Sequence, residues 1–249
     1  MDLDQAGGGT IMSGTLYGVG VGPGDPDLLT LKAVKVIAAA AVVAYPAAEG
    51  TESLARAIAA PHIPAGKTEI AIVTPMVPGK FPANDVYDDY AKEIAAHLSA
   101  GNDVAILCEG DPFLYGSFMY LFLRLAEDHP TQVIPGVSSL AACAAVAGAP
   151  LVSRNQVLTV IPGPLDEADL EARLLNSEAA AIMKVGRHLP KVRAVIEKLG
   201  RLDRAQYVER ATMDEQVVLP LADAPDTAPY FSMILVRSPE DVEDLGEPA

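Results

Sequence analysis

The sequence contains a glycine-rich turn of the kind that approaches small-molecule ligands. Within the stretch GVGVGPGDP, glycine occupies every second position: Gly18, Gly20, Gly22 and Gly24. Such turns often hold nucleotide phosphates, because glycine permits close approach of the backbone. A dinucleotide fingerprint read from Gly18 needs a glycine where Pro23 stands, and a P-loop needs a lysine well before Lys32. The turn is therefore either a loop for another ligand or a plain turn before a helix that starts at Asp-Pro.

Three further loops follow apolar runs: CEGDPFLYGS, IPGVSSLAA and KVGRHLP. Open α/β sheets bind ligands beyond the carboxyl ends of their strands, so loops in this position are candidate binding elements. The first is the most specific, because Gly110 permits close backbone approach and Asp111 suits either a helix cap or a polar ligand group. Each loop alone also fits a capped helix start.

The histidine and cysteine residues indicate neither a metal site nor a catalytic nucleophile pair. They are spread along the chain without metal-ligand spacing: His62, His97, His129, His188, Cys108 and Cys143. We therefore expect no protein-bound metal, no disulfide framework and no Ser-His-Asp or Cys-His set.

Composition limits the partners. The chain has 249 residues, half of them hydrophobic, which is enough for one large domain or two small ones. Its formal net charge of -15 argues against nucleic acid, since phosphate contacts need a positive surface. The start lacks the regions of a signal peptide, and the apolar run 33–48 is too short to span a bilayer. With reduced cysteines, we expect a cytoplasmic protein without a membrane partner.

Strand-like and helix-like segments alternate through the first half, which predicts parallel βαβ units. The expected strands are 15–21, 41–44, 69–73 and 103–108, and the expected helices are 27–40, 51–60, 83–100 and 113–128. Asp-Pro at 25–26 and at 111–112 marks two of the helix starts. Later strands are expected at 156–161, 179–184, 205–209 and 230–237, the last as an antiparallel return.

The alternation of strand-like and helix-like segments is interrupted near AEDHP, which predicts a domain boundary between Glu127 and Thr131. We expect a leader over 1–13, an N-terminal α/β domain over 14–129, a C-terminal α/β domain over 130–238 and an acidic tail over 239–249.

Five stretches between about Gly14 and Val236 carry a resemblance to a known family: GVGVGPGDPDLLTLKA, EGDPFLYGSFMYLFLRL, VIPGVSSLAA, IMKVGRHL and YVERATMDEQ. In this order they resemble the tetrapyrrole (corrin/porphyrin) methylases, and most closely the precorrin-2 C20-methyltransferases of cobalamin synthesis. The resemblance implies two α/β domains of the class III methyltransferase type, with S-adenosylmethionine and the tetrapyrrole in a cleft between them. The turn from Gly22 to Asp25 then lines that cleft and cradles no phosphate.

Carried over by position, the resemblance implies donor contacts at nine residues: Pro23, Gly110, Asp111, Leu114, Ser138, Ser139, Met183, Ala211 and Thr212. Ser138 and Ser139 open a helix where hydroxyl and backbone donors suit the methionine carboxylate. Met183, Ala211 and Thr212 resemble positions around the adenine, and Met183 also fits ordinary strand core.

The implied chemistry is an in-line methyl transfer from a sulfonium to an electron-rich carbon. Alignment of two ligands supplies about 7–11 kcal/mol at best, without a protein nucleophile. The C20 carbon then loses a proton, either to a base, with Glu109, Asp111 and Tyr115 as candidates, or to water through the conjugated substrate.

Precorrin-2 is a polycarboxylate, so local cations must bind it despite the net charge. The candidates are Lys80, Arg154, Lys184 and Arg187, with His188 and Arg210 in addition, each of which also fits a solvated surface charge. Two loops depart from the C20 pattern, TPMVPGKFPAND and IPGPL, which leaves substrate details open.

The leading expectation is therefore an enzyme that converts precorrin-2 to precorrin-3A, as a homodimer. Two alternatives stay open. The acceptor is a related tetrapyrrole, cobalt-factor II, uroporphyrinogen III or another precorrin; or the protein is a non-catalytic module that binds S-adenosylmethionine.

Overall fold

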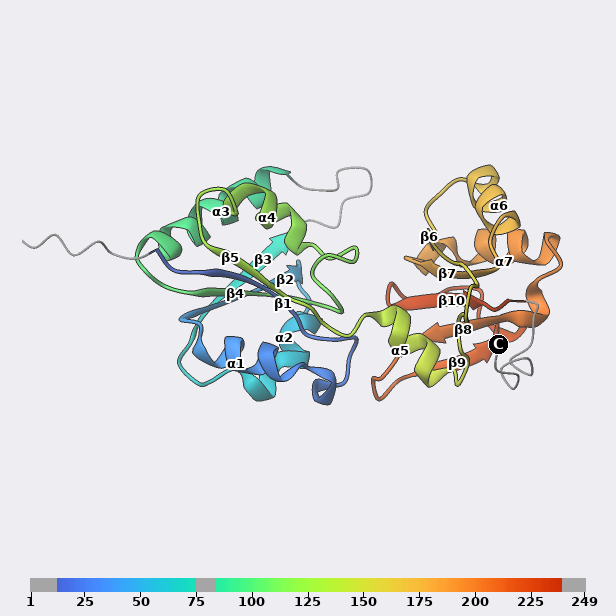
Figure 1. Ribbon diagram of the computed structural model, residues 1–249, viewed down its shortest axis with the longest axis horizontal. Helices are drawn as coiled ribbons and strands as arrows, with labels where there is room; N and C mark the ends of the chain where they lie inside the picture. Colours follow the sequence, from blue (N-terminus) through green and yellow to red (C-terminus); the bar gives the residue numbers. More distant parts are fainter. Residues whose placement is uncertain (1–12, 75–83, 239–249) are drawn as a thin grey trace, which may run out of the picture. The chain divides into compact units, whose positions relative to one another are not determined.

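The computed structural model describes residues 13–74 and 84–238, and the chain divides into two compact units, Met1–Val137 and Ser138–Ala249. Each unit contains one five-stranded sheet with helices against it. The expected fold class of two α/β domains is thus confirmed (Figure 1). The expected leader and acidic tail fall almost wholly outside the described residues.

The first unit is built on a parallel sheet in the order β3-β2-β4-β1-β5. Its strands are β1 (Leu16–Gly20), β2 (Val42–Ala48), β3 (Thr68–Thr74), β4 (Val104–Cys108) and β5 (Thr131–Ile134). The central strand β4 reads VAILC and is buried throughout, as expected for a parallel strand covered on both faces.

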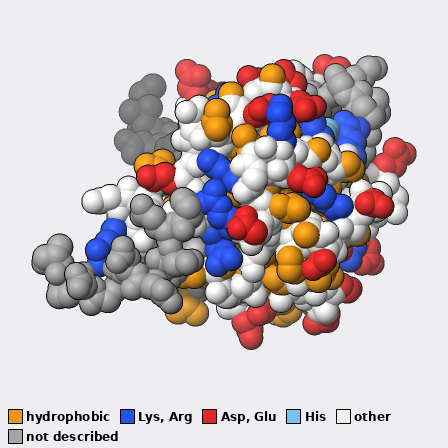
Figure 2. Space-filling model, turned by 90° about the vertical axis from the view of Figure 1, so that its right-hand side faces the viewer, with side chains coloured by type: hydrophobic (Ala, Val, Ile, Leu, Met, Phe, Trp, Pro, Cys, Tyr) orange, Lys and Arg blue, Asp and Glu red, His pale blue; other side chains and the backbone are white. Residues whose placement is uncertain are grey.

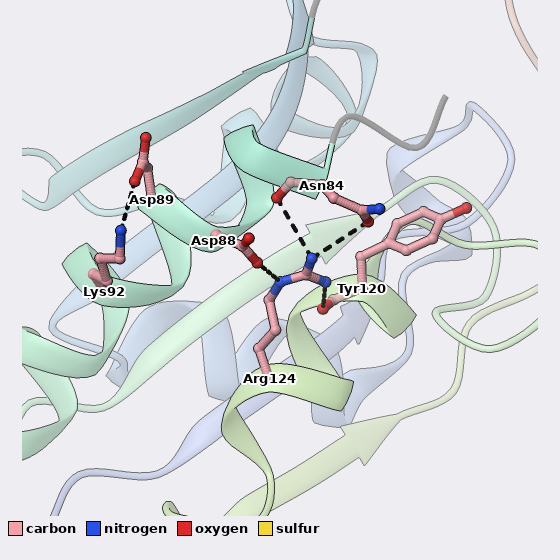
Figure 3. A network of polar contacts seen from close by, with 6 residues as sticks. All are labelled: Asn84, Asp88, Asp89, Lys92, Tyr120 and Arg124. Carbon is pink, nitrogen blue, oxygen red and sulfur yellow. Dashed lines mark hydrogen bonds and ion pairs between the residues drawn. The ribbon is translucent and has the colours of Figure 1, made fainter. Parts of the chain in front are cut away.

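Helices cover both faces of this sheet: α1 (Leu31–Ala39) and α2 (Leu54–Ala59) on one face, and α3 (Asn84–Ser99) and α4 (Phe118–Leu125) on the other (Figure 1). Arg124 of α4 links the second pair, since its guanidinium bonds Asp88 of α3 at 2.6 Å and the carbonyl oxygens of Tyr120 and Asn84 (Figure 3). This side chain ties α4 to the start of α3.

The domain boundary differs from the sequence expectation. The strand β5 pairs in parallel with β1, with Leu16 opposite Thr131 and Val19 opposite Ile134. A segment expected to open the second domain therefore completes the first sheet, and the division lies between Val137 and Ser138. Tertiary pairing, which local patterns do not encode, decides this position.

The second unit has a mixed sheet in the order β6-β7-β10-β8-β9. Its strands are β6 (Leu158–Pro162), β7 (Ala179–Met183), β8 (Ala205–Glu209), β9 (Val217–Pro220) and β10 (Ser232–Val236). As expected, β10 runs antiparallel to its neighbours β7 and β8, whereas β6 and β7 are parallel. The strand β9 has no counterpart among the expected elements and pairs antiparallel with β8.

The two faces of this second sheet have separate cores. Side chains of α6 (Glu167–Leu175) and α7 (Leu189–Lys198) pack on one face, and α5 (Ser139–Val146) packs on the other through Ala142 and Cys143. Lys and Arg side chains gather among Asp and Glu on the face shown in Figure 2, so the net charge does not describe every surface. Across the described residues, no helix combines the length and the apolarity that a membrane span requires.

Candidate functional site

The first unit brings three loops together at one edge of its sheet. Because β1, β4 and β5 are parallel, their carboxyl ends meet at the same edge, and the segments that follow them lie there. Backbone hydrogen bonds join the first two loops: the N–H of Gly110 donates to the carbonyl of Gly22 at 2.7 Å, and the reverse bond is 3.3 Å.

Glycine is required where these loops touch. A Cβ atom at Gly20 would lie 2.6 Å from the carbonyl oxygen of Gly110, and one at Gly136 would lie 2.1 Å from the same oxygen. Glycine is required at position 18 for another reason: an added Cβ atom there would lie 2.4 Å from the ring of Phe118 in α4. Gly22 adopts a φ of 83°, which favours glycine. The alternating glycines therefore serve helix packing, loop contact and a left-handed turn.

Asp111 ties the second loop to the third. One carboxylate oxygen accepts hydrogen bonds from the backbone N–H groups of Phe113 (2.9 Å) and Leu114 (3.2 Å), and the other accepts from the N–H of Gly136 (3.1 Å). The expected helix start at Asp111-Pro112 is wrong: α4 begins at Phe118, and Asp111 closes a turn before it. These bonds give Asp111 a positioning role.

Asp25 behaves similarly in the first loop. Its carboxylate accepts from the N–H of Asp27 at 2.8 Å and caps a single 3₁₀ turn over Pro26–Leu28, while α1 begins only at Leu31, capped by the Thr30 hydroxyl. The expected helix over 27–40 is therefore shorter at its start, and Pro23 is buried beside this turn.

Glu109 turns toward α2. Burial raises the pKa of its carboxyl above the ordinary value, while the backbone N–H of Ala55 in the first turn of α2 opposes this shift by hydrogen bonding. The carboxylates of Glu109 and Asp111 thus have different partners although the residues are close in sequence.

The turn after Asp111 exposes apolar side chains. The exposed fractions are 49% for Phe113, 37% for Leu114 and 41% for Tyr115. Tyr115 also adopts a φ of 58°, a conformation that side-chain-bearing residues rarely hold without support from their surroundings. Of the three candidate bases, Tyr115 has the most exposed side chain at this edge.

In the second unit, the ends of β6, β7 and β8 share one edge, because β7 and β8 both run antiparallel to β10. Met183 ends β7 and Lys184 follows it, whereas Arg210, Ala211 and Thr212 follow β8. The expected donor residues of this unit thus gather at one edge, apart from Ser138 and Ser139 at the start of α5, where the Ser138 hydroxyl caps the helix.

The backbone is strained at many of the expected positions. Five non-glycine residues of the described ranges have a positive φ: Tyr115, Arg154, Lys184, Arg210 and Thr212. All five were singled out from the sequence as candidate site residues. Such conformations cluster at functional sites, where surrounding contacts hold them. This coincidence links the sequence motifs to the geometry.

The expected cations occupy different surroundings. Arg187 lies exposed in a 3₁₀ turn after β7, Lys184 is half-buried, and Arg154 is exposed before β6. Burial lowers the pKa of His188, next to Arg187. Lys80 lies outside the described residues. Within the part of the chain that the structure describes, no group of three or more His, Cys, Asp or Glu residues is arranged to hold a metal ion.

Several residues at these edges escaped sequence reasoning. Gly136 has a structural signal, since glycine near the end of a strand often marks close backbone approach. Gly163 is another case: its N–H donates to the Met183 carbonyl at 2.7 Å. Glu209 carried no signal in its local pattern.

Comparison with known proteins identifies the family. The profile of the tetrapyrrole (corrin/porphyrin) methylases matches residues 15–225. The chain is 46% identical over 237 residues to a protein named precorrin-2 C(20)-methyltransferase from Sinorhizobium sp., covering 92% of this chain and 97% of that protein. It is 31% identical over 231 residues to cobalt-precorrin-2 C(20)-methyltransferase from Salmonella typhimurium, covering 91% and 97%.

A solved structure agrees with this relationship. The fold matches uroporphyrin-III C-methyl transferase from Thermus thermophilus complexed with S-adenyl homocysteine, with a TM-score of 0.66 and 26% identity over 90% of this chain and 97% of that one. The resemblance drawn from five sequence motifs is thereby confirmed. The chain belongs to the tetrapyrrole (corrin/porphyrin) methylases.

Proposed function

We propose that this protein transfers a methyl group from S-adenosylmethionine to C20 of precorrin-2, giving precorrin-3A in cobalamin biosynthesis. The relative named for this reaction is 46% identical and matched over 97% of its length. The observation of the structure that carries the proposal is that four motif residues with strained backbone, Tyr115, Lys184, Arg210 and Thr212, follow the carboxyl ends of strands β4, β7 and β8.

The residues present fit S-adenosylmethionine as donor. Gly20 and Gly136 let the loops after β1, β4 and β5 pack backbone against backbone, which gathers their main-chain groups at the edge that we assign to the ligand. Ser138 and the first N–H groups of α5 suit a carboxylate, because a helix N-terminus favours negative charge. The loop after β8 offers main-chain groups of Ala211 and Thr212 to the adenine.

The chemistry requires alignment more than a reactive side chain. S-adenosylmethionine supplies the methyl group already activated as a sulfonium. Asp111 holds the loops in register, and the exposed side chains of Leu114 and Tyr115 at the same edge provide apolar surface for a ligand. For the proton that leaves C20, the exposure of Tyr115 favours it over Glu109 and Asp111, both of which bond backbone N–H groups.

The acceptor's carboxylates require cations. Arg187 and Arg154 are exposed and suited to bidentate binding, and Lys184 lies on the β7 edge. The interspersed charges of the surface allow this despite the net charge of -15.

A second acceptor has specific support. The relative from Salmonella typhimurium is named for cobalt-precorrin-2 and is 31% identical to this chain. The relative from Sinorhizobium sp., named for precorrin-2 without cobalt, is 46% identical. We therefore rank the metal-free acceptor first. Parallel assays with precorrin-2, cobalt-factor II and uroporphyrinogen III, read by mass spectrometry, test this order. Methylation of precorrin-2 supports the proposal, preference for either other acceptor reassigns the substrate, and donor binding without transfer indicates a non-catalytic module.

We also propose that the enzyme is a cytoplasmic homodimer. Cys108 and Cys143 are buried free thiols, as suits a reducing cytoplasm. A homodimer is expected from the family, and Leu123 on α4 exposes 78% of its surface. Light scattering after size exclusion tests the dimer.

A further inference from the structure

A buried polar cluster underlies the loop that follows β8. The hydroxyl of Tyr207, which is fully buried, donates to one oxygen of the Glu209 carboxylate at 2.7 Å. The other oxygen pairs with the Arg210 guanidinium at 3.2 Å, and the Glu209 side chain is 14% exposed. A single carboxylate therefore joins the sheet core to the first residue of the loop.

The Tyr207 hydroxyl is held as a donor in this cluster. Burial raises the pKa of Tyr207, and the hydrogen bond to Glu209 adds to the shift. A neutral phenol beside a carboxylate makes a charge-assisted bond, which is stronger than a bond between neutral groups.

The loop above this cluster is strained. Arg210 and Thr212 have φ values of 46° and 69°, on either side of the buried Ala211. Three further bonds hold it: Arg210 N–H donates to the Phe231 carbonyl at 2.9 Å, Thr212 N–H to the Gln216 side chain at 2.8 Å, and Met213 N–H to the Arg210 carbonyl at 3.0 Å. Two left-handed residues within three positions persist only where surrounding contacts determine the conformation.

We propose that Glu209 is a positioning residue that clamps the loop Arg210–Thr212 and thereby sets the main-chain groups that receive the donor's adenine. Glu209 does not touch the reacting atoms; it acts through Arg210 and the sheet. This inference rests on the proposed function for the identity of the donor, whereas the clamp itself rests only on the contacts above.

The first unit supplies a matched control. Glu69 likewise joins a tyrosine and an arginine: it pairs with Arg56 at 2.7 and 3.0 Å and interacts with the Tyr45 hydroxyl. Arg56 and Glu69 lie on α2 and β3, outside the loops assigned to ligands. Glu69→Gln therefore removes the same kind of charge from the same kind of cluster.

The test compares Glu209→Gln, Glu209→Ala, Tyr207→Phe and Glu69→Gln by hydrogen exchange and by calorimetric titration with S-adenosylhomocysteine. We expect faster amide exchange over residues 210–216 in the Glu209 variants, and Kd for S-adenosylhomocysteine about tenfold higher in Glu209→Gln and higher still in Glu209→Ala. Tyr207→Phe has a smaller effect, and Glu69→Gln leaves both measurements at the wild-type values. In turnover assays, KM for S-adenosylmethionine rises more than KM for the tetrapyrrole.

Each other result has a defined meaning. Wild-type exchange over 210–216 in Glu209→Ala overturns the clamp. A loosened loop with unchanged Kd overturns the assignment of the loop to the donor. A wild-type protein that binds S-adenosylhomocysteine but methylates no precorrin-2 contradicts the proposed function alone. A wild-type protein that does not bind S-adenosylhomocysteine overturns both the proposed function and the assignment of the loop to the donor.

Discussion

The carboxylate of Asp111, after β4, accepts a hydrogen bond of 3.1 Å from the backbone N–H of Gly136, after β5. Its other oxygen binds the N–H groups of Phe113 and Leu114. One side chain thus joins the loops after β4 and β5 and closes the turn that exposes Tyr115. This relationship explains why an acidic residue follows Gly110 without requiring it to transfer a proton.

Replacement of Asp111 tests this positioning role. Asp111→Ala leaves three backbone donors without their acceptor, so we expect a loss of about 1–3 kcal/mol in the free energy of unfolding, with a smaller loss for Asp111→Asn. Urea titration followed by circular dichroism measures both. A variant of unchanged stability whose kcat falls about 10³-fold would instead indicate a direct role in proton transfer.

Gly136→Ala tests the close contact of the loops. The added Cβ would lie 2.1 Å from the Gly110 carbonyl oxygen, so the loop must shift, and we expect both lower stability and weaker binding of S-adenosylhomocysteine. Gly148→Ala is the control: this glycine has a φ of 59° and open space around it, so alanine there costs only about 1–2 kcal/mol of backbone strain. Equal thermal shifts and equal Kd values for the two variants would contradict the contact.

Glu109 predicts a pH-dependent difference in stability. Burial raises the pKa of Glu109 in the folded state. The contribution of this carboxyl to the free energy of unfolding is therefore fully present below the unfolded-state pKa of about 4.3, and it is lost as the pH rises through the folded-state pKa. Glu109→Gln, which keeps an acceptor for the Ala55 N–H, should therefore stabilise the protein relative to wild type at pH 8, with the difference shrinking toward pH 4. Urea titrations across this range measure it; a difference that grows toward low pH refutes the assignment.

Arg187→Ala tests recognition of the acceptor. Loss of a charge-assisted bond to a carboxylate should raise KM for precorrin-2 about tenfold or more and leave Kd for S-adenosylhomocysteine unchanged. Arg173→Ala, at an exposed position of α6, serves as control for the loss of an exposed arginine. If the two variants have the same KM, Arg187 is an ordinary surface charge.

The sequence predicted most elements because their patterns are local. The strand Ala205–Glu209 matches its expected bounds, and α3 and β4 lie within a residue of theirs. The helix start predicted at Asp111-Pro112 was wrong because this dipeptide can either start a helix or close a turn. Here it closes a turn, in which the Asp111 carboxylate binds the N–H of Gly136. The pairing of β5 with β1 was equally inaccessible, since it joins residues distant in sequence.

The candidate site divides in the same way. Resemblance selected Thr212, and the need for cations near a polycarboxylate selected Arg154 and Lys184; all three proved to have a positive φ, although neither argument states a backbone angle. Neither argument selected Glu209, whose partners Tyr207 and Arg210 become meaningful only once β8 is placed in its sheet. The contacts of Glu209 that hold the loop leave no recognisable spacing pattern in the sequence.

The most direct measurement is carbon-13 NMR of the product formed from methyl-labelled S-adenosylmethionine and freshly generated precorrin-2. We predict one labelled methyl resonance per molecule, assigned to C20. A label at any other carbon, or an unlabelled product recovered from protein that binds S-adenosylhomocysteine, would contradict the assignment to C20 methylation.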